Sequence, residues 1–132
     1  MDEHHVANSG WLSGRWRSFG YAFRGLAICF QTQVNARIHA FATVVVVALG
    51  FVLKLAAGEW CAVVISIAAV WTAECFNTAL EGMVDLVSPE RRPLAGRIKD
   101  LAAGAVLAVA IGAAVVGTII FGPKVLALLR GG

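Results

Sequence analysis

The chain has 132 residues, of which 59% are hydrophobic and 14% are charged, and its mean hydropathy is +0.78. This composition excludes a soluble globular protein, and the length is that of one domain, 1–132. The net charge of +3 is modest, and the basic residues lie in loops and at the termini, which argues against a nucleic-acid-binding protein. We therefore expect an all-α integral membrane protein.

The first predicted element is an amphipathic helix over residues 11–33. Its apolar positions recur in steps of three and four from Leu12 to Phe30, and the arginines lie off that stripe. A helix rich in Trp and Phe with a basic polar face is typical of segments that lie in the membrane interface. We expect this helix to lie on the membrane surface and not to cross it.

Three transmembrane helices follow, at about residues 38–57, 60–86 and 99–121. The first contains the unbroken apolar run AFATVVVVALGFVL, and each segment is close to the ~20 residues that a span needs. Gly58 and Glu59 predict a very short turn, so the second span returns antiparallel at once. Prolines and charges predict a loop over residues 87–98, and Pro123 helps to end the third span. That span carries a stripe of small residues typical of close helix packing: Gly104, Ala108 and Gly112.

Basic residues indicate how the spans are oriented. They cluster before the first span and between the second and third, whereas the opposite side carries few. The positive-inside rule therefore places the N-terminus and the 87–98 loop in the cytoplasm.

The second span contains an unusual polar stripe. At ~100° per residue, the spacing brings four side chains to one side of the helix: Glu74, Asn77, Glu81 and Asp85. Acids in so apolar a helix are costly against lipid and are a functional-site hypothesis by default. Lys99 and Asp100 begin the third span on the same side of the membrane.

This arrangement suits phosphoryl transfer to a lipid alcohol. Glu81 could hold Mg²⁺ while phosphate oxygens complete its coordination, and Glu74 could take a proton from a hydroxyl at headgroup level. Asn77 could orient either partner. Three basic residues could neutralise a polyphosphate: Arg91, Arg92 and Lys99. The chain has neither a P-loop nor a glycine-rich kinase loop, so scattered residues would have to hold the nucleotide.

Two other classes of function remain open. A non-catalytic oligomeric membrane protein would explain the small-residue stripe, but it would not need four polar residues in register. A small cation or proton carrier would explain the acids, but not the arginine-rich loop beside Lys99. Binding of MgATP is expected only of the kinase. Lys99 and Asp100, taken alone, are equally typical of an ion pair at the start of a helix.

The motifs resemble those of the small prokaryotic diacylglycerol kinase family, which includes the undecaprenol kinases. The resemblance rests on ECFNTALE at 74–81, VD at 84–85, KD at 99–100 and NARIH at 35–39, and it covers about residues 20–121. It implies a homotrimer in the bacterial inner membrane, with cytoplasmic active sites shared between protomers. It also implies ATP as phosphoryl donor, Mg²⁺ as cofactor, and diacylglycerol or undecaprenol as acceptor, with ARIH and the PLAGRIKDLAAGAVL stretch nearer to the undecaprenol kinases.

The resemblance also implies roles for single residues. Glu74 is the expected catalytic base, supported by Asn77 and Asp85, and Glu81 is the expected ligand of metal and nucleotide. The remaining expected nucleotide contacts are Tyr21, Glu90, Arg91, Arg92, Lys99 and Asp100. The family's second metal-binding glutamate falls on Gln33 in this chain. A neutral amide can offer an oxygen to Mg²⁺, but it lacks the charge of a carboxylate.

Overall fold

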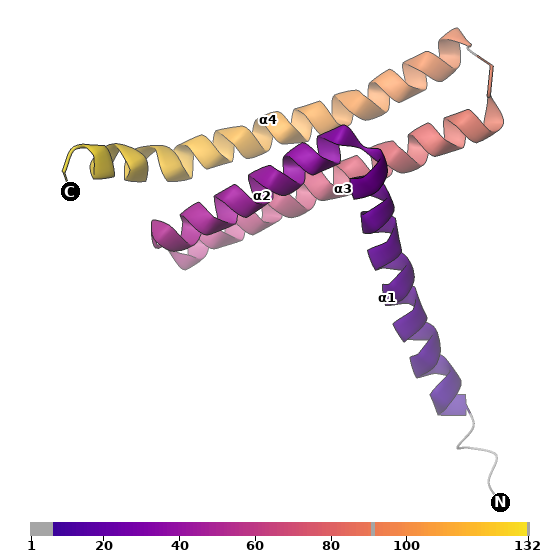
Figure 1. Ribbon diagram of the computed structural model, residues 1–132, viewed down its shortest axis with the longest axis horizontal. Coiled ribbons are helices and arrows are strands. Elements are labelled where there is room, and N and C mark those ends of the chain that lie inside the picture. The colour runs from indigo at the N-terminus through magenta and orange to yellow at the C-terminus, as the bar shows by residue number, and fades with distance from the viewer. Residues whose placement is uncertain (1–6, 91, 132) are drawn as a thin grey trace, which may run out of the picture.

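The computed structural model describes residues 7–90 and 92–131, with side chains from residue 14 onward. The described chain is helical: α1 (Ala7–Thr32), α2 (Val34–Val52), α3 (Ala57–Val87) and α4 (Pro93–Leu129). Helices α2, α3 and α4 run alongside one another, and α1 projects away from them at a steep angle (Figure 1). The last three helices are long and apolar enough to cross a membrane. The predicted fold class, three membrane spans after an N-terminal helix, is confirmed.

The break between α1 and α2 lies at a single residue. Gln33 has φ −105° and ψ 124°, an extended conformation that ends one helix and begins the next. Arg37 stabilises the bend, because its guanidinium donates to the carbonyl oxygens of Phe30 (3.2 Å) and Gln31 (2.6 Å) at the end of α1. Helix C-termini leave such carbonyls without partners. Gln33 stands at this bend, and its side chain reaches Glu81 on α3.

The turn between α2 and α3 comes earlier in the chain than the predicted turn at Gly58 and Glu59. Helix α2 ends at Val52, and the N–H groups of Lys54 and Leu55 donate back to Phe51 and Gly50 at 3.2 and 3.0 Å. This pair of bonds is a Schellman motif, with Lys54 in the left-handed region at φ 49°. The motif closes α2, so Gly58 and Glu59 lie in the first turn of α3.

Helix α4 begins before Lys99 and continues past Pro123 to Leu129, although Pro123 was expected to help end the span. Proline removes one backbone hydrogen bond, a loss that membrane helices tolerate where neighbouring groups compensate. Here Lys124 lies against α3, with Nζ 3.0 Å from Oε2 of Glu59. The same carboxylate oxygen accepts the backbone N–H of Ala56 at 2.7 Å. The end of α4 is thus attached to the start of α3.

Burial in the bundle is opposite to that of a soluble protein. Large apolar side chains such as Phe41, Phe51 and Ile65 point outward and are mostly exposed, while Glu74 and Asn77 are buried. A surface of this kind suits a hydrocarbon environment, and buried polar groups there mark a site. Close packing at the α2–α3 crossing needs a glycine: a Cβ on Gly50 would lie 2.6 Å from Cη2 of Trp60.

Candidate active site

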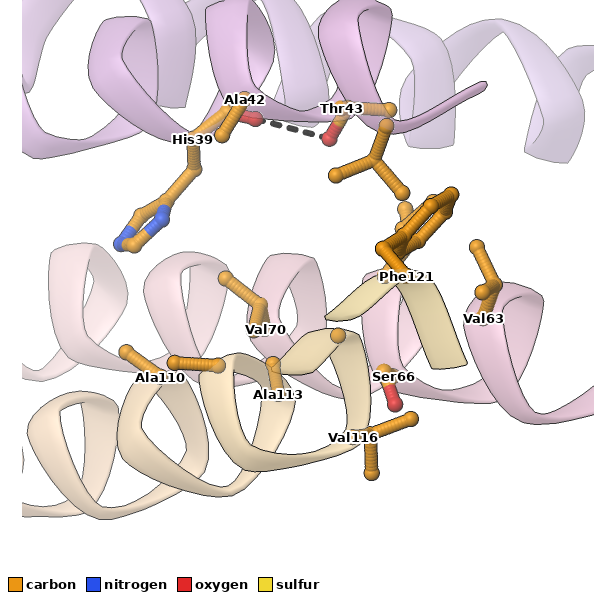
Figure 2. Close-up of a pocket in the computed structure, with 14 residues that line it drawn as sticks. His39, Ala42, Thr43, Val63, Ser66, Val70, Ala110, Ala113, Val116 and Phe121 are labelled. Carbon is orange, nitrogen blue, oxygen red and sulfur yellow. Dashed lines mark hydrogen bonds between the residues drawn. The ribbon is translucent and has the colours of Figure 1, made fainter. Parts of the chain in front are cut away.

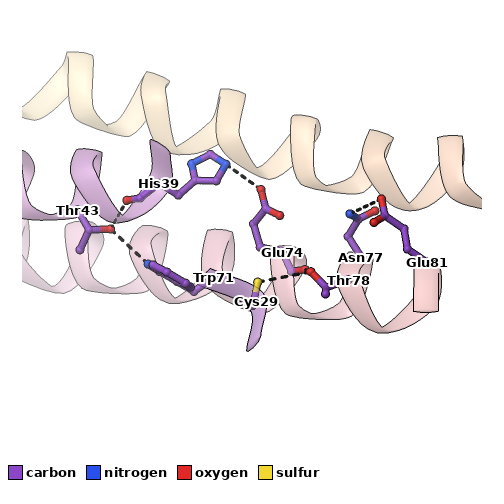
Figure 3. Close-up of polar contacts among 8 residues, drawn as sticks. All are labelled: Cys29, His39, Thr43, Trp71, Glu74, Asn77, Thr78 and Glu81. Atoms are coloured by element: carbon purple, nitrogen blue, oxygen red, sulfur yellow. Dashed lines mark hydrogen bonds and ion pairs between the residues drawn. The ribbon is translucent and has the colours of Figure 1, made fainter. Parts of the chain in front are cut away.

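The polar stripe of α3 faces into the bundle. Glu74, Asn77 and Glu81 follow one another at steps of three and four, and their side chains project from α3 toward the helices beside it (Figure 3). The side chain of Glu74 is 1% exposed and Asn77 is 7% exposed. The depth of the stripe therefore increases from the loop end of α3 toward the middle of the membrane.

Glu81 is held by two neutral amides. Its Oε1 accepts the side-chain N–H of Asn77 at 3.0 Å, and its Oε2 accepts that of Gln33 at 3.0 Å. Gln33 reaches this position because it lies at the break between α1 and α2. The Oδ1 atom of Asn77 is buried and has no hydrogen-bond partner among the described residues. Three oxygen-bearing side chains thus meet at one point: Asn77 and Glu81 from α3, and Gln33 from the break between α1 and α2.

Glu74 lies opposite α2. Its Oε1 is 3.2 Å from Nε2 of His39, yet this oxygen takes part in no regular hydrogen bond within the described chain. The contact is therefore electrostatic, at ion-pair distance. One turn away, the indole N–H of Trp71 donates to Oγ1 of Thr43 (3.3 Å), whose hydroxyl donates to the carbonyl oxygen of His39 (2.7 Å). These bonds fix the register of α2 against α3 (Figure 3).

Asp85 and Lys99 meet at the loop end of the stripe. Nζ of Lys99 lies 2.6 Å from Oδ1 of Asp85, and both side chains are partly or largely exposed. The pair joins the end of α3 to the start of α4. Asp100, the next residue along α4, is exposed. The lysine is accordingly partly exposed at the loop end of the bundle.

Other predicted site residues lie apart from this cluster. Glu90 and Arg92 pair with each other in the α3–α4 connection at 3.1 Å, and both are exposed. Arg91 lies outside the described residues. Tyr21 is on the projecting part of α1, 63% exposed, with the Arg24 guanidinium 5.9 Å from the centre of its ring. Among the described residues, no hydrogen bond or ion pair joins Tyr21, Glu90 or Arg92 to the Glu74–Glu81 stripe.

An apolar groove extends from His39 deeper into the bundle (Figure 2). It has a volume of about 250 Å³ and is lined by residues of α2, α3 and α4. Its walls are mostly alanine and valine, with Val70 near one end and Phe121 in the lining from α4. The site thus combines buried polar groups with an adjacent hydrocarbon-lined space.

Comparison with known proteins identifies the family of the chain. The family described as prokaryotic diacylglycerol kinase matches residues 20–121, a stretch that contains the whole polar stripe, Gln33 and His39. The chain belongs to this family. The predicted resemblance is thereby confirmed.

Individual relatives point to the same chemistry. The undecaprenol kinase of Bacillus subtilis is 37% identical over 113 residues, which cover 86% of this chain and 92% of the relative. The diacylglycerol kinase of Synechocystis is 42% identical over 113 residues, 85% of this chain and 65% of the relative. The diacylglycerol kinase of Pseudomonas aeruginosa is 30% identical over 86 residues, 65% of this chain and 70% of the relative.

Membership in the prokaryotic diacylglycerol kinase family, together with the three candidate spans, makes the chain a multi-pass bacterial membrane protein of a lipid kinase family. The sequence motifs include His39 only as the last residue of NARIH at 35–39, and they do not predict its contact with Glu74. A histidine within an apolar segment, one span away from a buried acid, is the signal that could have drawn attention to it.

Proposed function

We propose that the chain is an ATP-dependent kinase that phosphorylates the hydroxyl of a membrane lipid alcohol, either diacylglycerol or undecaprenol. The observation that carries the proposal is the position of Glu74. Its carboxylate is buried in a membrane bundle, beside an apolar groove and seven residues from Glu81. Seven residues correspond to about 10 Å along a helix, so a base within the membrane and a phosphate site nearer water share one stripe.

The reaction assigns a separate task to each part of the stripe. Glu74 takes the proton of the lipid hydroxyl as the hydroxyl oxygen bonds to the γ-phosphorus of ATP and the bond to the β–γ bridging oxygen breaks. ADP then leaves with the electrons of that bond. Asn77 holds Glu81 in place, and Asp85 holds Lys99 where its ammonium group can contact phosphate oxygens. Positioning and electrostatics supply most of the catalysis in reactions of this kind.

Glu81 and Gln33 are the residues that would hold Mg²⁺. Carboxylate and amide oxygens are ligands that this hard cation accepts, and it commonly binds through one or two carboxylates together with substrate phosphates. The Gln33 amide, which donates to Glu81 in the structure, would present its oxygen after a rotation of the amide group. The cation would neutralise charge on the phosphates. In this chain one carboxylate, Glu81, balances the charge of Mg²⁺, whereas the family resemblance implies two glutamates at the metal.

The remaining nucleotide contacts and the assembly follow from the family resemblance. We propose that Lys99 and Asp100 bind nucleotide phosphate, and that further contacts come from Tyr21, Glu90, Arg91 and Arg92. Because Tyr21 and the Glu90–Arg92 pair lie apart from the stripe in one protomer, a homotrimer with shared sites would be the means of bringing them to it. The positive-inside rule supports a cytoplasmic active site in the bacterial inner membrane.

The experiment is a kinase assay on the protein purified in micelles. MgATP-dependent phosphorylation of diacylglycerol and of undecaprenol is measured side by side, with Glu74→Gln as the inactive variant. Loss of a general base lowers turnover by roughly 10²- to 10⁴-fold. Glu59→Gln is the matched control, because it makes the same change at the opposite end of α3 and should keep turnover.

Turnover on one lipid identifies the acceptor. Phosphorylation of neither lipid by a folded wild-type protein would contradict the proposal, and full turnover of Glu74→Gln would show that the base is another group.

A further inference from the structure

We propose that His39 is a positioning residue for Glu74, holding the carboxylate of the general base in its reactive orientation. This inference rests on the proposed function, because it assigns a role in the same proton transfer. The sequence motifs of the stripe lie on α3 and α4, whereas His39 belongs to α2. It acts on the reaction only through Glu74.

Burial makes a partner for Glu74 necessary. A carboxylate that is 1% exposed has lost its hydration, and such a charge persists only where another group compensates it. Nε2 of His39 lies 3.2 Å from Oε1, and this oxygen has no regular hydrogen bond among the described residues. The His39 imidazole is therefore the group that compensates Oε1 of Glu74 for its lost hydration.

Contact with one oxygen determines what the other can do. With Oε1 facing the imidazole, rotation of the carboxylate is restricted, and Oε2 is left for the incoming hydroxyl. The His39 ring is 21% exposed and lines the end of the apolar groove (Figure 2). A lipid hydroxyl that approaches Glu74 along this groove would meet a base already held in one orientation.

The backbone around His39 is also fixed. Thr43 donates its hydroxyl to the His39 carbonyl oxygen at 2.7 Å and accepts the Trp71 indole N–H at 3.3 Å. Trp71 is three residues before Glu74 on α3, so this link lies one turn from the imidazole–carboxylate contact. Two contacts between α2 and α3 thus maintain the same register. Positioning of a base by a supported side chain is a recurring feature of preorganised sites.

The test is steady-state kinetics of lipid phosphorylation in micelles with His39→Phe and His39→Gln. Phe keeps the ring size without a polar atom, and Gln keeps an N–H at about the position of Nε2. We expect His39→Phe to lower kcat roughly ten- to a hundredfold, as for the loss of a polar contact with a charged group, with KM for MgATP unchanged. His39→Gln should recover a large part of this loss. Thr118→Ala, at an exposed position of α4 outside the groove, should keep kcat.

A double-mutant cycle separates positioning from general structural support. If His39 acts through Glu74, adding His39→Phe to Glu74→Gln should change kcat by less than about twofold, because residues that act as a unit are not additive. An equal loss in both backgrounds would overturn the proposal, and so would full turnover of His39→Phe. If His39→Phe does not fold, the same cycle is run with His39→Gln, and additive losses there overturn the proposal.

Failure of the proposed function is distinguishable from failure of this inference. A wild-type protein without lipid kinase activity, or a fully active Glu74→Gln, removes the proposed function and the role of His39 with it. An inactive Glu74→Gln beside fully active His39 variants removes the role of His39 alone.

Discussion

Glu74 and Asn77 are buried and Glu81 is half-buried, whereas the other buried side chains of the described residues are small or apolar. Each has a neighbour in the structure: Glu74 faces an imidazole, and Asn77 donates to Glu81. Polar groups in a membrane interior are retained at a cost, and they are ordinarily functional. At this scale the chain departs from the pattern that the family resemblance implies at Gln33, where a neutral amide donates to the Glu81 carboxylate.

Gln33→Glu should strengthen Mg²⁺ binding. A second carboxylate beside Glu81 adds the charge that a divalent cation favours, so the Mg²⁺ concentration that gives half-maximal turnover should fall by roughly tenfold. Without Mg²⁺, the two like charges repel each other, and the thermal midpoint should fall until Mg²⁺ is added. Titration of turnover and of the melting temperature with Mg²⁺ measures both effects.

The control for this change is Gln31→Glu, which adds the same charge at an exposed position two residues away. It should leave the Mg²⁺ requirement unchanged. An identical Mg²⁺ dependence in wild type and Gln33→Glu would show that Gln33 does not contact the metal.

At the scale of elements, helix ends decide where the site residues lie. Gln33 is the single extended residue between α1 and α2, and from this position its side chain reaches α3. The Schellman motif after α2 lets α3 return immediately beside α2. The register of the α2–α3 pair then brings His39 opposite Glu74. Pro123 does not end α4, and next to it the Lys124–Glu59 ion pair joins α4 to the start of α3.

Lys54→Gly should stabilise the α2–α3 turn. Lys54 has φ 49°, in the left-handed region that costs a residue with a Cβ about 1–2 kcal/mol, and glycine is the usual residue at this place in a Schellman motif. We expect the free energy of unfolding to rise by about 1 kcal/mol, measured by denaturation in mixed micelles. Lys54→Ala removes the same charge but keeps the Cβ, so it should not stabilise. Equal stabilisation by both variants would indicate that the charge, and not the backbone, is responsible.

At the scale of the whole molecule, the outward face of the bundle is apolar and unpartnered within one protomer. Gly104 and Gly112 of the small-residue stripe lie on α4 with open space around the position of a Cβ. The proposed homotrimer would bury part of this surface between protomers, and small residues allow helix backbones to approach closely.

Gly112→Leu should weaken the proposed trimer without disturbing the protomer. A Cβ at this position would have open space around it among the described residues, so we expect the loss to arise between chains. The mass of the protein part of the micelle complex, from light scattering, should shift from three chains toward one. Ala103→Leu, on the other side of α4, should leave the mass unchanged. A wild-type mass of one chain would contradict the trimer.

The sequence by itself determined the membrane class, the three spans, and the polar stripe of α3. These features follow from local hydropathy and from the helical repeat, which need no knowledge of distant contacts. The residue types and their spacing also led to the hypothesis of phosphoryl transfer at the stripe, and the motifs identified the family.

Only the tertiary structure decided which residues meet across helices. The bond from Gln33 to Glu81 joins positions 48 apart in the chain, and the His39–Glu74 contact joins α2 to α3. Neither periodicity nor composition encodes such pairs, because they depend on where one helix ends and on the register at which the next packs against it. The extended Gln33, the Schellman motif at Lys54 and the Thr43–Trp71 link set these quantities, and all three are properties of the folded chain.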